Sequence, residues 1–338
     1  LRAAFADEEP PGSSVLAGLR DRGAGASSVH LPGPTDEADP IVRPDGDVPA
    51  GARLGRYQVV GELAAGGVGV VLQGRDLDLG RDVAVKVLRG RYAENRELIR
   101  RFVEEAQIGG QLQHPGVVPV YELAIDGRGR PFIAMKLVRG RTLARLLEER
   151  PSPSVESARF LGIFEQVAQT VAYAHARGVV HRDLKPSNVM VGTFGEVQLM
   201  DWGFAKVLRR GGAADDAGPT GQTDAELDAT AGDADRAEGT GTDERDSAIE
   251  TVRSEASHRH SVHGSVLGTP AYMPPEQARG DVASLDERCD VFALGAILCE
   301  ILTGAPAYPG RQSTETLRRA RDGDLADAHA RLEACGAG

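Results

Sequence analysis

Short apolar runs, separated by glycine-rich or charged turns, are the main pattern between residues 57 and 138. Each run is only a few residues long and rich in valine, which is typical of β-strands. We predict strands at 58–63, 68–73, 82–88, 117–123 and 131–138. One helix is predicted among them, over 95–113, because its apolar side chains recur at spacings of three and four.

After about residue 140 the apolar positions follow a helical spacing. The longest such stretch covers 154–177, where Phe160, Phe164 and Val167 share one face. We expect further helices at 142–149, 274–279 and 290–302, and short strands around Val179, Val189 and Val197. A strand-rich part followed by a helix-rich part predicts an α+β chain in two lobes.

Two stretches show neither period. Residues 1–52 are rich in Gly, Pro, Ala and Ser, and residues 209–264 contain 13 acidic residues and six arginines. Such segments bury too little apolar surface to offset the entropy lost on ordering, so we predict a disordered leader and a disordered acidic insert. The folded domain is expected at 53–338, with one lobe at 53–138 and the other at 139–338.

Composition narrows the function classes. A net charge of −11, most of it in the insert, argues against a nucleic-acid partner, which would need a basic surface. The three cysteines, at 289, 299 and 335, show no close spacing, so neither a disulfide framework nor a zinc site is indicated and a reducing cytoplasm is expected. The apolar stretch 291–302 is shorter than the roughly 20 residues that span a bilayer, and no membrane segment is expected.

A glycine-rich loop lies between the first two predicted strands, where residues 64–71 read Ala-Ala-Gly-Gly-Val-Gly-Val-Val. Glycines at 66, 67 and 69 would let backbone N–H groups approach phosphate oxygens. A flexible hairpin is the alternative for this loop alone.

The next strand carries Lys86, which needs an anionic partner if it is buried, and Glu105 on the following helix could supply one. The alternative is an edge-strand lysine that reaches water.

Residues 181–188 read His-Arg-Asp-Leu-Lys-Pro-Ser-Asn and bring three polar side chains into one short loop. Asp183, Lys185 and Asn188 could together orient a hydroxyl group, neutralise a phosphoryl group and hold a metal ion. A charged surface turn explains so restrictive a pattern poorly.

Asp201 follows an apolar run in the triad Asp-Trp-Gly and suits a hard cation, although an aspartate at a β-turn is an equal alternative.

These motifs occur in one order and end with Gly-Thr-Pro-Ala-Tyr-Met-Pro-Pro-Glu at 268–276. The chain therefore resembles the bacterial, eukaryotic-like serine/threonine protein kinase family over about 57–309. The resemblance implies a bilobal protein-kinase-like fold, with a β-rich N-terminal lobe and a helical C-terminal lobe that is incomplete at residue 338. Lys185 resembles the Ser/Thr-specific class.

The resemblance also implies the reaction, which is transfer of the γ-phosphate of ATP to Ser or Thr hydroxyls of protein substrates, with Mg²⁺. The catalytic residues would be Asp183 as base, Lys185 beside the γ-phosphate, and Lys86 on the α- and β-phosphates, fixed by Glu105. Asn188 and Asp201 would be the metal ligands. The nucleotide pocket would comprise Leu63, Gly66, Gly67, Gly69, Val71, Ala84, Lys86, Met135, Lys136, Val138 and Met190.

Several positions depart from the family pattern or extend it. Ala64 replaces the first glycine of the loop, which is tolerable at negative φ. Trp202 replaces a phenylalanine, and we expect it to fill the space left by Gly109 on the helix of Glu105. Thr269 resembles a substrate-facing threonine that contacts Asp183 and Lys185. Autophosphorylation within 251–265 is a further hypothesis.

Two other readings stay open from the sequence. A catalytically impaired, kinase-like scaffold would usually lack the lysine, the base or a metal ligand, and none of these is missing. A small-molecule phosphotransferase could share the fold, but the segment 268–276 is typical of kinases that hold an extended peptide. No arginine in 311–338 matches the one that pairs, in the family, with the glutamate at position 276.

Overall fold

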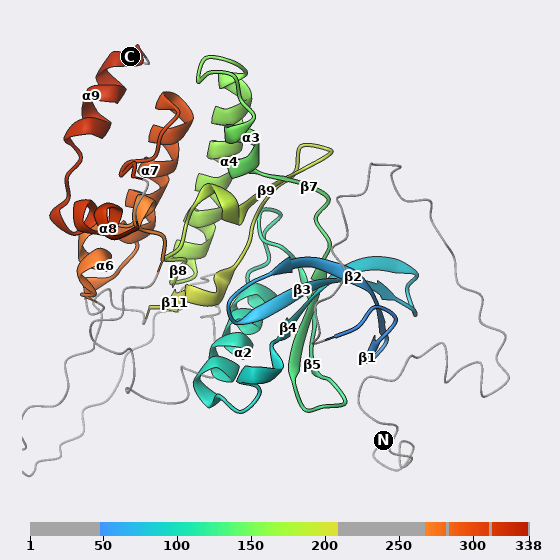
Figure 1. Ribbon diagram of the computed structural model, residues 1–338. Helices are drawn as coiled ribbons and strands as arrows, with labels where there is room; N and C mark the ends of the chain where they lie inside the picture. The colour runs from blue at the N-terminus through green and yellow to red at the C-terminus, as the bar shows by residue number, and fades with distance from the viewer. Residues whose placement is uncertain (1–47, 209–267, 282–283, 311–312, 337–338) are drawn as a thin grey trace, which may run out of the picture.

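The computed structural model describes residues 48–208, 268–281, 284–310 and 313–336, and these form two lobes (Figure 1). The N-terminal lobe is a six-stranded sheet with one helix against it, and neighbouring strands are antiparallel throughout. In spatial order its strands are β1 (Arg53–Leu54), β2 (Tyr57–Ala65), β3 (Gly69–Asp76), β4 (Arg81–Leu88), β6 (Pro131–Lys136) and β5 (Val120–Ile125). All five predicted strands are present, with ends that shift by up to three residues.

Both faces of the central strands are buried, which explains their nearly continuous apolar sequence. On β6, Phe132 and Ala134 join one apolar cluster with Tyr57, whereas the intervening Ile133 joins another that includes Phe102 of helix α2 (Arg96–Gln111). The helix begins at Asn95, whose side chain accepts the backbone N–H of Leu98 at 3.1 Å, as expected of an N-cap. Helix α2 is therefore fixed against the sheet by its apolar face.

The boundary expected between leader and lobe needs a correction. Val48 is only 4% exposed and belongs to the same apolar cluster as Tyr57, and the N–H of Gly51 donates to the carbonyl of Val59 at 2.8 Å. Burial of this valine and the backbone hydrogen bonds that Gly51 and Ala52 share with Val59 together hold this segment on the sheet. Residues 48–52 thus belong to the lobe rather than to the leader. The remainder of the expected leader and the expected insert lie outside the described residues.

The C-terminal lobe is mainly helical. Its helices are α3 (Leu143–Glu148), α4 (Ser157–Ala176), α6 (Pro275–Arg279), α7 (Arg288–Thr303), α8 (Ser313–Asp322) and α9 (Ala326–Ala334). One small sheet has β9 (Val189–Gly192) in the middle, between β7 (Gly140–Thr142) and β10 (Val197–Leu199). Another pairs β8 (Val179–Val180) with β11 (Lys206–Val207). Helix α4 starts three residues later than predicted because Glu156 has a left-handed backbone with φ of 52°. None of the helices in the described ranges is long and apolar enough to cross a bilayer.

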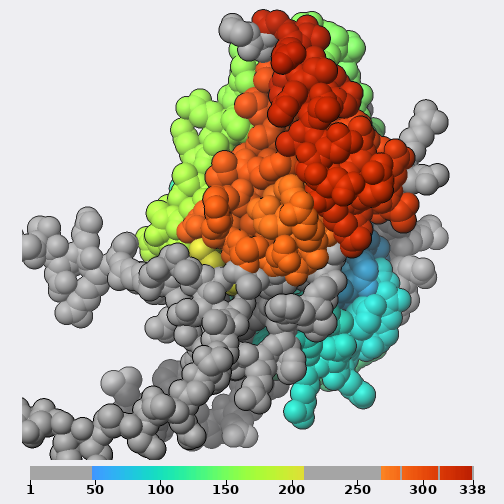
Figure 2. Space-filling view, turned by 90° about the vertical axis from the view of Figure 1, so that its left-hand side faces the viewer, coloured from blue at the N-terminus to red at the C-terminus, as the bar shows by residue number. Residues whose placement is uncertain are grey.

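Helices α4 and α7 form the centre of this lobe. Their facing sides bury Phe160, Val167 and Val171 against Ala293 and Ile297 in one apolar cluster. The 3.6-residue spacing recognised in the sequence is thus the packing stripe between two helices. Helices α6, α7, α8 and α9 lie together on one face of the molecule (Figure 2).

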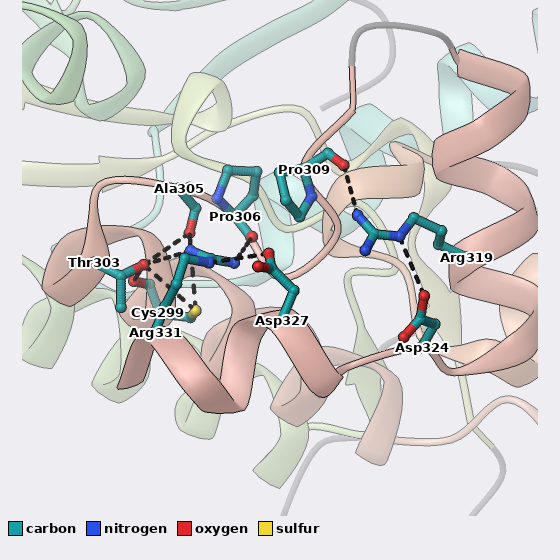
Figure 3. A network of polar contacts seen from close by, with 9 residues as sticks. All are labelled: Cys299, Thr303, Ala305, Pro306, Pro309, Arg319, Asp324, Asp327 and Arg331. Carbon is teal, nitrogen blue, oxygen red and sulfur yellow. Dashed lines mark hydrogen bonds and ion pairs between the residues drawn. The ribbon is translucent and has the colours of Figure 1, made fainter. Parts of the chain in front are cut away.

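The loop 304–310 after α7 is tied down by arginines from the last two helices (Figure 3). Arg331 of α9 donates to the carbonyl oxygens of Ala305 and Pro306, both at 2.8 Å, and to the hydroxyl of Thr303 at 2.6 Å. Arg319 of α8 donates to the carbonyl oxygen of Pro309 at 3.0 Å in the same loop. These bonds satisfy backbone acceptors beyond the C-terminal end of α7.

The same loop supports the segment 268–276. Tyr308 is fully buried and shares an apolar cluster with Met273 and Ala320. Its backbone N–H points to the carbonyl oxygen of Ala271 at 3.5 Å. The loop 304–310 therefore braces a segment for which the family resemblance implies substrate binding.

Candidate active site

Lys86 and Glu105 form an ion pair between the sheet and helix α2. The Nζ atom of Lys86 lies 2.6 and 2.7 Å from the two carboxylate oxygens of Glu105, and 3.6 Å from Oδ1 of Asp201. Strand β4 lies between β3 and β6, so the alternative of an edge-strand lysine is excluded. Burial lowers the pKa of Lys86, but the charges of Glu105 and Asp201 outweigh it and raise the pKa, so the ammonium stays charged.

Asp183 and Lys185, both in the loop after β8, meet the side chain of Thr269, which comes from a distant segment of the chain. Lys185 Nζ donates to Oδ2 of Asp183 at 2.7 Å and to the hydroxyl of Thr269 at 2.9 Å. The hydroxyl of Thr269 donates in turn to Oδ1 of Asp183 at 3.1 Å. The carboxylate of Asp183 is thus held with an ammonium beside it. The contacts expected of Thr269 are present.

Asn188 and Asp201 are brought together by the pairing of two short strands. Val189 of β9 pairs with Leu199 of β10, and the N–H of Met200 donates to the carbonyl oxygen of Asn188 at 2.8 Å. The side-chain amide of Asn188 donates to the carbonyl oxygen of Asp183 at 2.9 Å, which orients the side chain. Its amide oxygen and the Asp201 carboxylate supply the hard oxygen donors that Mg²⁺ prefers, so this pair fits the expected metal.

The charge of Asp201 is set by its neighbours. Burial raises the pKa of this carboxyl group, but the positive charge of Lys86, followed by contributions from His181 and Lys185, brings the pKa below its ordinary value. Asp201 also has a left-handed backbone, with φ of 62°. A non-glycine residue in that conformation is unusual and recurs at functional sites. An ionised carboxylate is the form that binds a divalent cation.

The expected nucleotide pocket follows the strand register. Val71 of β3 pairs with Lys86 of β4, and Ala84 pairs with Met135 of β6. Leu63 is on β2, which pairs with β3, whereas Met190 belongs to β9 of the other lobe. The backbone N–H of Lys136 donates to the carbonyl oxygen of Pro119 at 3.0 Å.

The glycine-rich loop forms a tight turn between β2 and β3. Gly66 N–H donates to the carbonyl of Gly69 at 2.9 Å, and Gly67 is exposed with open space around it. Ala64 pairs with Val71 as an ordinary strand residue, without positive φ. The substitution of the first glycine is therefore tolerated, as the sequence predicts.

Residues 57–222 match the family model described as the protein kinase domain. The chain is also 35% identical over 258 residues to the serine/threonine-protein kinase PknD of Chlamydia pneumoniae, covering 73% of this chain and 24% of that protein. It belongs to the protein kinase family. The kinase PknD of Chlamydia felis is 34% identical over 266 residues, covering 76% of this chain and 25% of that protein. The present kinase domain thus spans about a quarter of the length of these relatives.

One residue that anchors the site of this kinase domain was missed in the sequence. Asp290 of α7 is 1% exposed, and its carboxylate accepts the backbone N–H groups of His181 at 2.7 Å and Arg182 at 2.8 Å. It thereby holds the loop of Asp183, in which Arg182 has a φ of 65°. The available signal was an aspartate within an apolar helix, because a buried carboxylate needs several donors.

The expected packing of Trp202 against Gly109 is wrong. Trp202 is 5% exposed and its ring centroid lies 4.7 Å from that of His181. A methyl group built on Gly109, however, would meet Cγ2 of Val120 at 3.1 Å, and no atom of Trp202 lies within 4 Å of it. Val120 of β5 therefore fills the space beside Gly109.

Proposed function

We propose that the protein transfers the γ-phosphate of ATP to serine or threonine hydroxyls of protein substrates, including its own activation segment between 201 and 276. The observation that carries this proposal is the arrangement of four charged side chains. Lys86 is paired with Glu105, and Lys185 is paired with Asp183. The ammonium groups of Lys86 and Lys185 are thus held in fixed positions by their carboxylate partners, as phosphoryl transfer requires.

The chemistry can be assigned residue by residue. The carboxylate of Asp183 orients the incoming hydroxyl group and accepts its proton, because it already accepts the Thr269 hydroxyl at 3.1 Å. Lys185 neutralises charge on the transferred phosphoryl group, and Lys86 holds the α- and β-phosphates. Asn188 and Asp201 would hold Mg²⁺, which neutralises charge on the phosphates when bound.

Substrate class and location belong to the proposal. The segment 268–276 has its Thr269 beside Asp183 and is braced by Tyr308. A fixed segment next to the proposed base suits binding of an extended peptide. We propose reaction in the cytoplasm, where thiols at 289, 299 and 335 stay reduced. The phosphorylation sites hypothesised within 251–265 lie outside the described residues.

A pair of lysine substitutions tests the function. Lys86→Met removes the ammonium that pairs with Glu105, and we expect kcat/KM for phosphorylation to fall on the order of 10²–10³-fold. Lys136→Met is the control, because only the backbone of Lys136 is assigned to adenine. The readout is transfer from labelled ATP to a generic basic protein. Absence of transfer by the unmodified protein, or equal rates for it and Lys86→Met, would contradict the proposal.

A further inference from the structure

Two arginines that belong to none of the recognised motifs lie against the glycine-rich turn. The Nε atom of Arg89 donates to the carbonyl oxygen of Gly66 at 3.0 Å, and Nη2 of Arg91 donates to that of Gly67 at 2.9 Å. The backbone N–H of Arg89 also donates to the carbonyl oxygen of Val68 at 3.1 Å. One short segment thus binds three successive carbonyl groups of the turn.

The segment that carries the two arginines is itself anchored. It continues directly from Leu88, the fully buried last residue of β4, and forms a 3₁₀ turn over Gly90–Tyr92. Tyr92 packs against the apolar cluster that contains Leu88 and Phe102, and the guanidinium of Arg91 lies 4.8 Å from the Tyr92 ring centroid. The arginines therefore offer a fixed support to a turn that is otherwise exposed.

Binding of these carbonyls determines where the neighbouring amide groups point. The carbonyl of one residue and the N–H of the next lie on opposite sides of a trans peptide plane, and no described peptide bond is cis. With the carbonyls of Gly66 and Gly67 held by Arg89 and Arg91, the N–H groups of Gly67 and Val68 point away from the arginines. Backbone N–H groups that are left free in a glycine-rich turn are the groups that bind phosphate oxygens.

We propose that Arg89 and Arg91 are positioning residues that hold the glycine-rich turn with its amide groups presented to the phosphates of the nucleotide. This inference rests on the proposed function, since it assumes ATP as substrate. The arginines act through the backbone of the turn, so they contribute to recognition of phosphates and leave recognition of adenosine unchanged. Without them the turn must order itself on each binding event, which weakens affinity.

The double variant Arg89→Met/Arg91→Met tests the inference, because methionine keeps an apolar stem and removes every donor. We expect its Kd for MgATP to rise on the order of tenfold, as two exposed hydrogen bonds would give. Its Kd for adenosine should equal that of the unmodified protein. KM for ATP should rise with little change in kcat. Exposed Arg96→Met, five residues beyond Arg91, is the control and should change neither constant.

Comparison of the Kd values for MgATP and adenosine separates the outcomes. A double variant that binds MgATP as tightly as the unmodified protein overturns the inference. An equal rise in Kd for MgATP and for adenosine also overturns it, since it would indicate a general disturbance of the lobe. If the unmodified protein binds adenosine and MgATP equally or not at all, the proposed function fails, and the inference fails with it.

Discussion

Gly109 and Val120 lie so close together that a side chain at position 109 of helix α2 requires Val120 to give way. The built methyl group would be 3.1 Å from Cγ2 of Val120, whereas the adjacent Gly110 has no atom within 4 Å of the same position. Both glycines are in α2, four and five residues after Glu105. The two positions therefore form a matched pair for testing how tightly this helix packs on the sheet.

Leucine at these two positions should have opposite effects. Gly109→Leu overpacks the contact with Val120, and we expect a loss of about 1–3 kcal/mol of stability together with reduced kinase activity, because α2 carries Glu105. Gly110→Leu should gain about 0.5–1 kcal/mol from helix propensity. Urea unfolding and phosphorylation rates provide the measurements. Equal stabilities for the two variants would show that β5 yields easily to the new side chain.

Removal of the charge from Asp290 should loosen the catalytic loop. Its carboxylate accepts N–H groups from His181 and Arg182 and lies 2.8 Å from Nε2 of His175. Because asparagine offers only one acceptor, we expect Asp290→Asn to lose about 1.5–3 kcal/mol of stability and to lower kcat. Asp322→Asn, at an exposed carboxylate, is the control. An unchanged kcat in a folded Asp290→Asn protein would refute a positioning role for Asp290.

The thiols should differ in reactivity. Burial, with the nearby carboxylate of Glu276, raises the pKa of Cys289 to about 12, whereas Cys335 is exposed. At pH 8 only a fraction of about 10⁻⁴ of the Cys289 side chains is then in the reactive thiolate form. This fraction rises tenfold for each pH unit until the pH approaches the pKa. We expect iodoacetamide to label Cys335 in the folded protein and Cys289 only after unfolding, as peptide mass spectrometry would show. Comparable labelling of both in the folded protein would contradict the burial of Cys289.

Arg331 should matter more for stability than its surface position suggests. It donates to Thr303, Ala305 and Pro306. Arg331→Ala removes the donor to the carbonyl oxygen of Pro306, whereas that of Ala305 keeps the Thr303 hydroxyl at 3.2 Å, and we expect a loss of roughly 1–3 kcal/mol. Arg318→Ala removes an exposed pair with Asp322 and should cost only about 0.3–0.5 kcal/mol. Thermal unfolding of both variants checks this difference. The prediction fails if they unfold at the same temperature.

The two-lobe fold and the charged residues of the site could be predicted because each depends on short segments. The alternation in β3 and the stripe of α4 are visible within a few residues, and Asp183, Lys185 and Asn188 occur in one restrictive pattern. Their chemistry follows from residue types that are costly to bury unless paired. The sequence therefore indicated which side chains must meet, although it could not give the distances.

Features that depend on contacts between distant residues, or on helices with few apolar side chains, were missed. Helices α8 and α9 were not predicted, since they bury only Thr316, Ala320 and Ala328 and are otherwise rich in charge. The bonds from Asp290 to the loop of Asp183 join residues more than a hundred positions apart. The aspartate within an apolar helix indicates a buried carboxylate, but nothing local in the sequence indicates its partners. The position of Val120 beside Gly109 likewise depends on how β5 is placed.

Trp202 is the single tryptophan of the chain and directly follows the proposed metal ligand Asp201. It is buried against His181, and among the described residues its indole N–H has no hydrogen-bond acceptor. The tryptophan emission of this protein therefore has one origin, and indole emission responds to the polarity around the ring. Without any label, a change in emission wavelength would therefore be an optical signal from the turn that carries Asp201.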